Sequence, residues 1–559
     1  MKKKFVFFLL IVVLAQQTWA QNITDLQHIQ IKWQMQANDQ PQKGQFAAAF
    51  IFTNTGNTKV DLTEWTLCFS YPREVKEVIG KNAIFENRGG EFVTMEVAKS
   101  FGVLTAGAML TVNYLAKGKT LNVTDAPSGL YFVSKTNPSK VFVVKNFVSD
   151  LSSLNEIDRI AAAERYRKFA GTNDIAENQL QKIIPKPVSY TESNKVFSLN
   201  RNTKLIVAPV FEKEASLFNQ ELSSILGNKL MLSTSPSANS ILLKEVKGMA
   251  AEAYNLKVEE TGVQIEASTT HGAFYGLQSL KMLMPTAVWS KTNTEIAIPC
   301  VTVNDYPRFA YRSLMLDVAR NFQPKAEVLK LLDLLALYKI NTFHFHLNDD
   351  EGWRLEIKSL PELTEFGAKR GHTFAESTHL RPAYGSGPDT AKVPGSGYYT
   401  QADFLEILRY AKSRHITVIP EIETPGHARA AVKAMDYRYQ KLMQQGKPTL
   451  AVAYLLRDTL DQSVYKSVQG YNDNVMNVAL PSTYKFIHTV VDELISLYQQ
   501  AGSPLKTVHM GGDEVPQGVW EKSPAIAQLM AQEKITSYDD LWYYYWDKVN
   551  GILKSKNLH

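Results

Sequence analysis

The spacing of apolar residues changes along the chain and divides it into parts. In the first part apolar residues alternate with polar ones, as in the run from Trp65 to Tyr71. The positions that share one face of this run are Trp65, Leu67, Phe69 and Tyr71. Such alternation is typical of a strand with one buried face, so residues 21–150 are predicted to form a β-sandwich. Its aromatic side chains form either the core or a platform for sugars.

The second part has mixed spacing. Leu154–Phe169 is an amphipathic stretch rich in Ala, Glu and Arg, which predicts a linker helix within residues 151–182. Residues 183–305 combine short apolar runs with the helical stretches Glu212–Leu226 and Gly272–Met284. Strands interleaved with two helices predict a small α+β domain with its helices on one face of a sheet. It contains no polar cluster of catalytic type, so we expect it to support its neighbour.

From residue 306 onward, short apolar runs alternate with amphipathic helices. The runs are Ser313–Val318, Asn341–Leu347, Ile416–Ile422 and Thr507–Met510. Helices are predicted to begin at Pro324, after the N-cap Thr400, and at Ser482. Four successive βα units predict a TIM-type (β/α)8 barrel. The 47 residues after Gly512 (559 − 512) hold no fifth apolar run, so residues 306–559 are expected to form only its first half.

Each apolar run of this last part ends in polar side chains. The clusters are Asp317 with Arg320 and Asn321, Asn348–Asp350, Glu423–His427, and Asp513–Glu514. In a parallel barrel the carboxyl ends of the strands form the ligand site, which makes Asp513 and Glu514 a candidate catalytic pair. The alternatives are a helix N-terminus for Asp513–Glu514, a solvated turn for Asp349–Asp350 and a hydrogen-bonded loop histidine for His427.

Composition and charge narrow the class of protein. A length of 559 residues exceeds what one core organises, so three domains are expected. Met1–Ala20 combines three lysines, an apolar run and a small-residue cleavage site, which predicts a signal peptide and a periplasmic or secreted protein. Removing the three lysines takes the net charge from +6 to about +3 (6 − 3), so nucleic acid is not the expected partner. No later stretch predicts stable membrane insertion.

Cysteines and histidines raise the question of metals. Cys68 and Cys300 are the only cysteines, too few for a disulfide framework or a cysteine metal site. We expect both to be buried small hydrophobic residues, and whether they pair stays open. His344 and His346 alternate to one face of a predicted strand, as two metal ligands do, so a metal-dependent barrel hydrolase is one alternative. Against it, the pair lies in mid-strand and the polar cluster comes later.

Four motifs in this order carry a resemblance to a known family. They are Arg312–Phe322, His344–Arg354, Glu421–Ala428 and His509–Glu514. These segments resemble the strand ends of family 20 glycoside hydrolases, the β-N-acetylhexosaminidases, and are most similar to the bacterial chitobiase branch. Asp125–Tyr131 is similar to part of that branch's carbohydrate-binding-like domain. His271–Gln278 is similar to part of its middle domain.

The resemblance implies a reaction and roles for five residues. The reaction is exo-acting, retaining hydrolysis of terminal N-acetylglucosamine or N-acetylgalactosamine from glycans, without a cofactor or metal. Glu514 is then the general acid and base, and Asp513 holds the 2-acetamido group of the substrate, which itself acts as the nucleophile. Arg320 binds sugar hydroxyls, and Asp349 with His427 supports Glu514.

The resemblance also implies a second half-barrel that this sequence does not contain. We therefore expect residues 21–559 alone to aggregate or to show little activity, because the edge strands would keep unpaired backbone groups. An alternative from another class is a sugar-binding or structural protein with an inactive half-barrel. An assay of this chain beside a longer natural version distinguishes the two.

Overall fold

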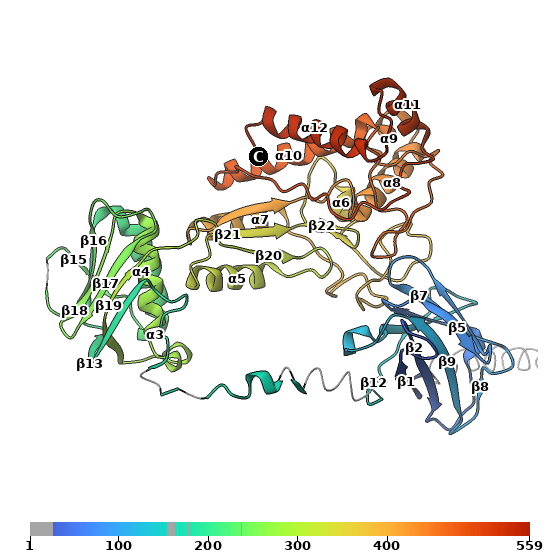
Figure 1. Cartoon of the computed structure of the whole chain (residues 1–559), viewed down its shortest axis with the longest axis horizontal. Coiled ribbons are helices and arrows are strands. Elements are labelled where there is room, and N and C mark those ends of the chain that lie inside the picture. The colour runs from blue at the N-terminus through green and yellow to red at the C-terminus, as the bar shows by residue number, and fades with distance from the viewer. Residues whose placement is uncertain (1–25, 154–162, 165, 174, 177–178, 236) are drawn as a thin grey trace, which may run out of the picture.

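Three parts follow one another along the chain (Figure 1). The computed structural model describes residues 26–153, 163–164, 166–173, 175–176, 179–235 and 237–559. The predicted signal peptide and most of the predicted linker helix Leu154–Phe169 lie outside these residues. The third part lies between the other two in the view of Figure 1. None of the described helices combines the length and the apolarity needed to cross a bilayer.

The first part contains two five-stranded sheets that pack face to face around an aromatic core. One sheet has the order β12 (Phe147–Asp150), β1 (Ile29–Asn38), β2 (Gln45–Asn54), β9 (Met109–Lys117), β5 (Val75–Ile79). The other has the order β11 (Val141–Val143), β10 (Ser128–Ser134), β4 (Trp65–Ser70), β7 (Phe92–Val97), β6 (Ala83–Asn87). A short pair, β3 (Val60–Asp61) with β8 (Val103–Leu104), completes it. The aromatic residues of the Trp65–Tyr71 run are core residues.

Strand β4 is buried on both faces, whereas its alternation predicted burial of one face only. On its second face Cys68 packs with Phe92 and Tyr131 in a separate apolar cluster. A loop of the third part lies at this face: the Tyr131 hydroxyl is 3.2 Å from Nδ1 of His372. The one-face prediction was wrong because the covering loop lies about 300 positions away in the sequence. Alternation within a strand carries no information on such a contact.

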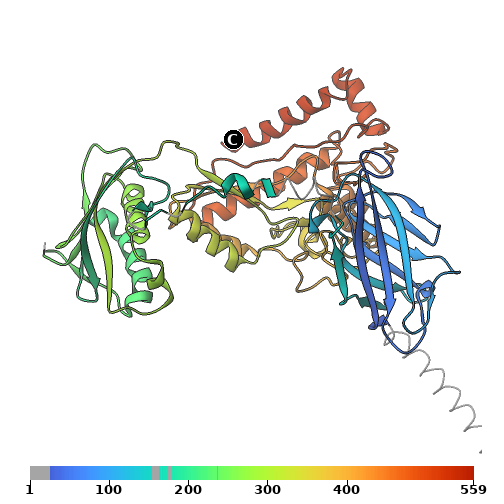
Figure 2. The ribbon, with the colours of Figure 1, turned by 60° about the horizontal axis from the view of Figure 1, so that its bottom comes forward.

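The second part is a seven-stranded mixed sheet with two long helices. The strand order is β13 (Ser189–Asn200), β19 (Glu295–Asp305), β17 (Tyr254–Glu259), β18 (Gly262–Ala267), β16 (Ser240–Glu245), β14 (Lys204–Val207), β15 (Met231–Ser233). Helices α3 (Glu212–Leu226) and α4 (Thr270–Met282) lie on one face, as Figure 2 shows. Helix α4 also contacts a helix of the third part. The Glu252 carboxylate pairs with Arg312 at 2.6 Å, which ties the two parts together.

The third part is built on a parallel three-stranded sheet of order β20 (Ser313–Asp317), β21 (Thr342–His346), β24 (Thr417–Glu421). A hairpin of β22 (Asn348–Asp349) and β23 (Gly352–Trp353) follows β21. The helices are α5 (Lys325–Leu337), α6 (Glu362–Glu365), α7 (Gln401–Lys412), α8 (Arg429–Gln444), α9 (Pro448–Val452), α10 (Pro481–Ala501), α11 (Pro524–Glu533) and α12 (Asp540–Ser555). Helix α7 packs against α5 and α10, which gives the repeated βα arrangement that the apolar spacing predicted.

Helix α7 illustrates how local sequence sets these elements. The Thr400 hydroxyl accepts a hydrogen bond from the Asp403 N–H at 3.1 Å, and the Asp403 carboxylate accepts one from the Thr400 N–H at 3.2 Å. This capping box satisfies N–H groups that lack partners within the helix. The apolar residues predicted to face inward are buried: Phe404, Ile407, Leu408 and Ala411.

The predicted fourth strand, Thr507–Met510, is not a regular strand. It pairs with β24 through one isolated bridge between Glu421 and His509, and the Thr424 N–H donates to the Met510 carbonyl. On its other side, the Val508 N–H donates to the carbonyl of His559. The glycines at 511 and 512 turn the backbone away directly afterwards. The run therefore occupies the position of a strand next to β24 but is too short to form a ladder.

Candidate active site

Gly511 and Gly512 connect the Thr507–Met510 run to the acidic pair Asp513 and Glu514 at the edge of the sheet. Their φ angles are 68° and 112°, a region that favours glycine. A Cβ at Gly511 would lie 1.8 Å from the Glu423 carboxylate, and a Cβ at Gly512 would lie 2.6 Å from the Trp546 ring. Only glycine fits between these groups. The backbone thus passes close to the core and then presents Asp513 and Glu514 at the surface, with exposed side-chain fractions of 67% and 41%.

His427 links the acidic pair to the interior. Its imidazole is buried, with Nε2 at 3.4 Å from the Glu514 carboxylate and at 3.6 Å from the Asp513 carboxylate. Its other nitrogen, Nδ1, lies 3.2 Å from Oδ1 of Asp349. Burial lowers the pKa of His427, but the hydrogen bonds to Asp349 and Asp350 outweigh it and raise the pKa to about 11. The His427 ring next to Asp513 and Glu514 is therefore positively charged at neutral pH.

Asp349 is a fully buried carboxylate with three basic partners. Besides His427, its Oδ2 lies 2.8 Å from Nη2 of Arg320 and 2.9 Å from Nε2 of His346. Burial alone raises the pKa of Asp349, but the hydrogen bonds from both histidines and the Arg320 charge outweigh it and hold the pKa at about 2. Arg320 is held from a second side by Asp317, at 2.9 Å. All five residues singled out in the sequence therefore belong to one connected network.

The network includes residues that sequence reasoning did not place in the site. His346 was considered only as a metal ligand, yet its Nδ1 lies 2.6 Å from Glu421, and its pKa rises to about 10 because the hydrogen bonds to Asp349 and Glu421 outweigh burial. Burial, Glu421 and Asp513 raise the pKa of Glu423 to about 9, so this acid is protonated at neutral pH. Glu421 is the last residue of β24 and Glu423 follows two positions later, so both point inward, and this alternation was the available signal.

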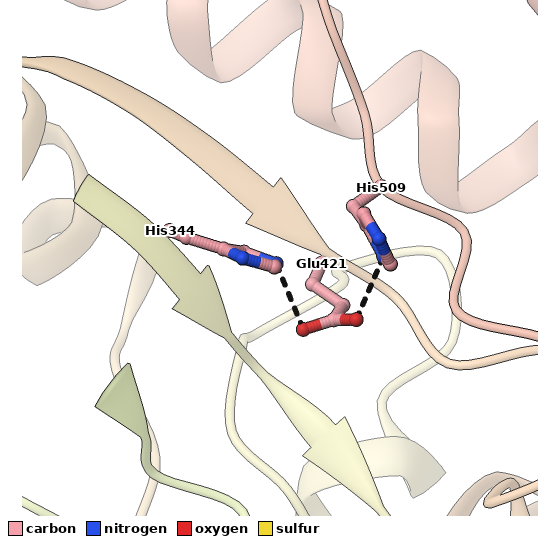
Figure 3. Close-up of side chains that lie close together, drawn as sticks. All are labelled: His344, Glu421 and His509. Carbon is pink, nitrogen blue, oxygen red and sulfur yellow. Dashed lines mark ion pairs between the residues drawn. The ribbon is translucent and has the colours of Figure 1, made fainter. Parts of the chain in front are cut away.

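The second histidine of the mid-strand pair also contacts Glu421. Figure 3 shows Glu421 between His344 and His509, with N···O distances of 2.9 Å to Nε2 of His344 and 2.7 Å to Nδ1 of His509. Zn²⁺ binds such ligands at about 2.0–2.2 Å in a tetrahedron, which sets neighbouring donor atoms about 3.3 Å apart. The observed N···O separations are shorter than that and are those of ion pairs. We therefore describe this cluster as two histidines paired with the Glu421 carboxylate.

Comparisons with known proteins show the family of this chain. The description "Glycosyl hydrolase family 20, catalytic domain" matches residues 309–559, and "domain 2" of the same family matches residues 180–306. An inactive mutant of the family 20 exo-β-N-acetylglucosaminidase from Vibrio harveyi aligns with a TM-score of 0.76 and 30% identity, covering 94% of this chain and 74% of that one. The chain belongs to glycoside hydrolase family 20.

Curated relatives of this family 20 chain carry consistent names. A β-hexosaminidase of Vibrio vulnificus is 35% identical over 445 residues, which are 78% of this chain and 50% of the relative. The N,N'-diacetylchitobiase of Vibrio harveyi is 34% identical over 470 residues, which are 81% of this chain and 52% of the relative. The chain thus spans about half the length of the curated relatives it matches. Its likeness extends beyond the catalytic part to the preceding domains.

The raised pKa of His346 predicts how stability depends on pH. A charged imidazole whose pKa rises on folding stabilises the fold fully below its unfolded pKa of about 6.5. That contribution falls as pH rises and is lost near pH 10. The unfolding temperature of His346→Gln should therefore lie furthest below that of the wild type under pH 6.5 and approach it towards pH 10. His488→Gln, at a half-exposed histidine of α10, serves as the control. A deficit that grows with pH would contradict the assignment.

The short N···O distances from His344 and His509 to Glu421 predict how the protein responds to metals. We expect a chelator to leave the unfolding temperature unchanged, and added Zn²⁺ to raise it no more in the wild type than in His344→Gln/His509→Gln. An ion bound at 100 times its Kd would add about 2.7 kcal/mol to the free energy of unfolding, which thermal melts detect easily. A zinc-dependent rise seen only in the wild type would restore the metal interpretation.

Proposed function

We propose that the protein is an exo-acting β-N-acetylhexosaminidase that releases terminal N-acetylglucosamine or N-acetylgalactosamine from the non-reducing ends of chitobiose-like oligosaccharides or glycoconjugates. The observation that carries the proposal is the contact of Glu514 with His427, whose other nitrogen is held by buried Asp349. The names of the relatives support the same reaction. One solved family member, from Vibrio harveyi, was crystallised with N-acetylglucosamine.

Glu514 acts as the general acid in this proposal. It protonates the glycosidic oxygen, and as its carboxylate forms, the charged His427 ring 3.4 Å away stabilises the negative charge. In the second step the same carboxylate removes a proton from the attacking water. Asp349 keeps the His427 ring oriented through Nδ1 and keeps it charged, so the buried pair sets the electrostatics of the acid.

Asp513 has a different role because the nucleophile belongs to the substrate. The 2-acetamido oxygen attacks the anomeric carbon and forms a cyclic oxazolinium ion, with retention of configuration after water opens it. The Asp513 carboxylate orients the acetamido N–H and balances the positive charge of the ring. Arg320 is fixed by Asp317 and Asp349 and keeps 26% of its side chain exposed, which suits a rigid donor for sugar hydroxyls.

The site of action follows from the proposed export. Cleavage of a signal peptide near Ala20 would leave the protein in the periplasm or outside the cell. Glycans that end in N-acetylhexosamine are then its partners.

A pair of substrates tests the function. The acetamido-dependent mechanism predicts turnover of an aryl N-acetyl-β-glucosaminide and failure on the matching aryl β-glucoside, because the glucoside lacks the internal nucleophile. Rates of aryl release by a longer natural version, assayed beside this chain, measure both. Equal turnover of the two substrates by the longer version would refute the mechanism. No turnover of either substrate by the longer version would favour a sugar-binding or structural protein.

Two substitutions test the division of roles. Glu514→Gln should lower kcat by about 100-fold or more with a poor leaving group and much less with a good one, because protonation of the leaving oxygen then matters little. Asp513→Asn should slow both substrates alike, because the oxazolinium ion loses its counter-charge. Asp539→Asn, at an acid outside the network, is the control. If Asp513→Asn stayed within about threefold of wild type, a change below about 0.7 kcal/mol, its role would be wrong.

A further inference from the structure

A turn of the β-sandwich touches a loop of the catalytic part. The turn joins β6 to β7 and contains Gly90, whose N–H donates to the carbonyl of Gly470 at 3.3 Å. A Cβ at Gly90 would lie 2.4 Å from Cζ of Tyr471. Gly90 therefore packs against the end of the Tyr471 side chain, which a side chain at position 90 would have to displace.

The loop that receives this turn is closed on itself. The Ser467 N–H donates to the Tyr471 carbonyl at 2.7 Å, and the Gly470 N–H donates to the Ser467 carbonyl at 2.9 Å. The Ser467 hydroxyl in turn accepts a hydrogen bond from the Tyr471 N–H at 3.1 Å. Tyr471 is buried beneath the guanidinium of Arg429, 4.9 Å from its ring centre. Residues 467–471 are thus tied together in one hydrogen-bonded turn.

This loop carries a side chain that contacts the proposed acid. Nε2 of Gln469 donates to Oε2 of Glu514 at 2.7 Å. Oε2 is also the oxygen that lies 3.4 Å from His427. Glu514 is therefore held between a histidine of the barrel and an amide that the loop supplies.

The rest of the domain contact shows that the turn is held in place. The Arg381 guanidinium donates to the Arg88 carbonyl of the same turn. The Gly385 N–H donates to the Ser70 hydroxyl at 3.0 Å. Together with the buried second face of β4, these contacts hold the sandwich against the loop that follows α6. The turn then has little freedom to move away from residues 467–471.

We propose that the β6–β7 turn of the sandwich, through Gly470, sets the position of Gln469 on the acid Glu514. The sandwich is then part of the positioning apparatus of the catalytic site and not only an appended module. This inference rests on the proposed function for its effect on rate, since Glu514 must be the acid for its orientation to matter. Gln469 is a positioning residue because it acts through Glu514.

The first experiment tests the contact between the turn and the loop. Gly90→Ala adds a methyl group against Tyr471, whereas Gly80→Ala, at the other end of β6, adds one where nothing lies within 4 Å. Both glycines have positive φ, 57° and 84°, so both substitutions introduce backbone strain. Hydrogen–deuterium exchange should become at least about fivefold faster in residues 467–471 of Gly90→Ala and stay unchanged there in Gly80→Ala. Unchanged exchange in Gly90→Ala, or acceleration spread over the whole chain, would overturn the proposal.

The second experiment tests the contact between the loop and the acid. Gln469→Met keeps the length of the side chain and removes the N–H donor, with Gln462→Met, at an exposed position of the same segment, as control. Because the lost hydrogen bond is to a charged group, Gln469→Met should lower kcat about tenfold on a disaccharide of N-acetylglucosamine. KM should stay nearly unchanged, and the loss in kcat on an aryl glycoside should be smaller. Gly90→Ala should reproduce this pattern. An equal loss of kcat on both substrates, or a change in KM alone, would overturn the proposal.

The two experiments separate this inference from the proposed function. A longer natural version without turnover of either N-acetylhexosaminide would contradict the proposed function, while the exchange measurement would still decide whether the sandwich positions residues 467–471. Full turnover with unchanged exchange in Gly90→Ala would leave the function standing and remove the inference.

Discussion

The structure of the site depends on one buried carboxylate. Asp349 has almost no exposed surface, yet it contacts Arg320, His346 and His427 within 3.2 Å. A lone charge in that position would cost several kcal/mol, so the partners must stay charged and in place. Arg320 follows β20, His346 is the last residue of β21, and His427 follows β24. Asp349 therefore joins three segments into one geometry and fixes the ring that faces Glu514.

Around this carboxylate, close backbone approaches decide where the reactive groups lie. Gly511 passes against Glu423, and Gly512 passes against two tryptophan rings of α12. Behind them Glu423 stays protonated, so it adds no negative charge beside Asp513. In the proposed mechanism Asp513 then remains the carboxylate that balances the positive charge of the oxazolinium ion, while Glu514 gives and takes protons. The division of labour between two adjacent acids thus follows from their different neighbours.

The sandwich extends this arrangement across a domain boundary. Its strand β4 is buried on both faces, and its Gly90 turn meets the loop that carries Gln469. Interfaces between domains of one chain often permit relative motion. Here backbone hydrogen bonds at Gly90 and Gly385 restrict it. The same close approach that requires glycine at position 90 transmits the position of the sandwich to the acid.

The sequence by itself predicted most of the helices and strands and placed the candidate site residues at strand ends. The spacing of Phe404, Ile407 and Leu408 reflects local periodicity, and the cap at Thr400 depends on a residue three positions away. Asp513 and Glu514 follow an apolar run, so their position at the edge of the sheet could be predicted as well. Only the tertiary structure decided that Thr507–Met510 pairs through a single bridge, that both faces of β4 are covered, and that Gln469 meets Glu514. These outcomes depend on contacts between residues dozens to hundreds of positions apart, which no local pattern encodes.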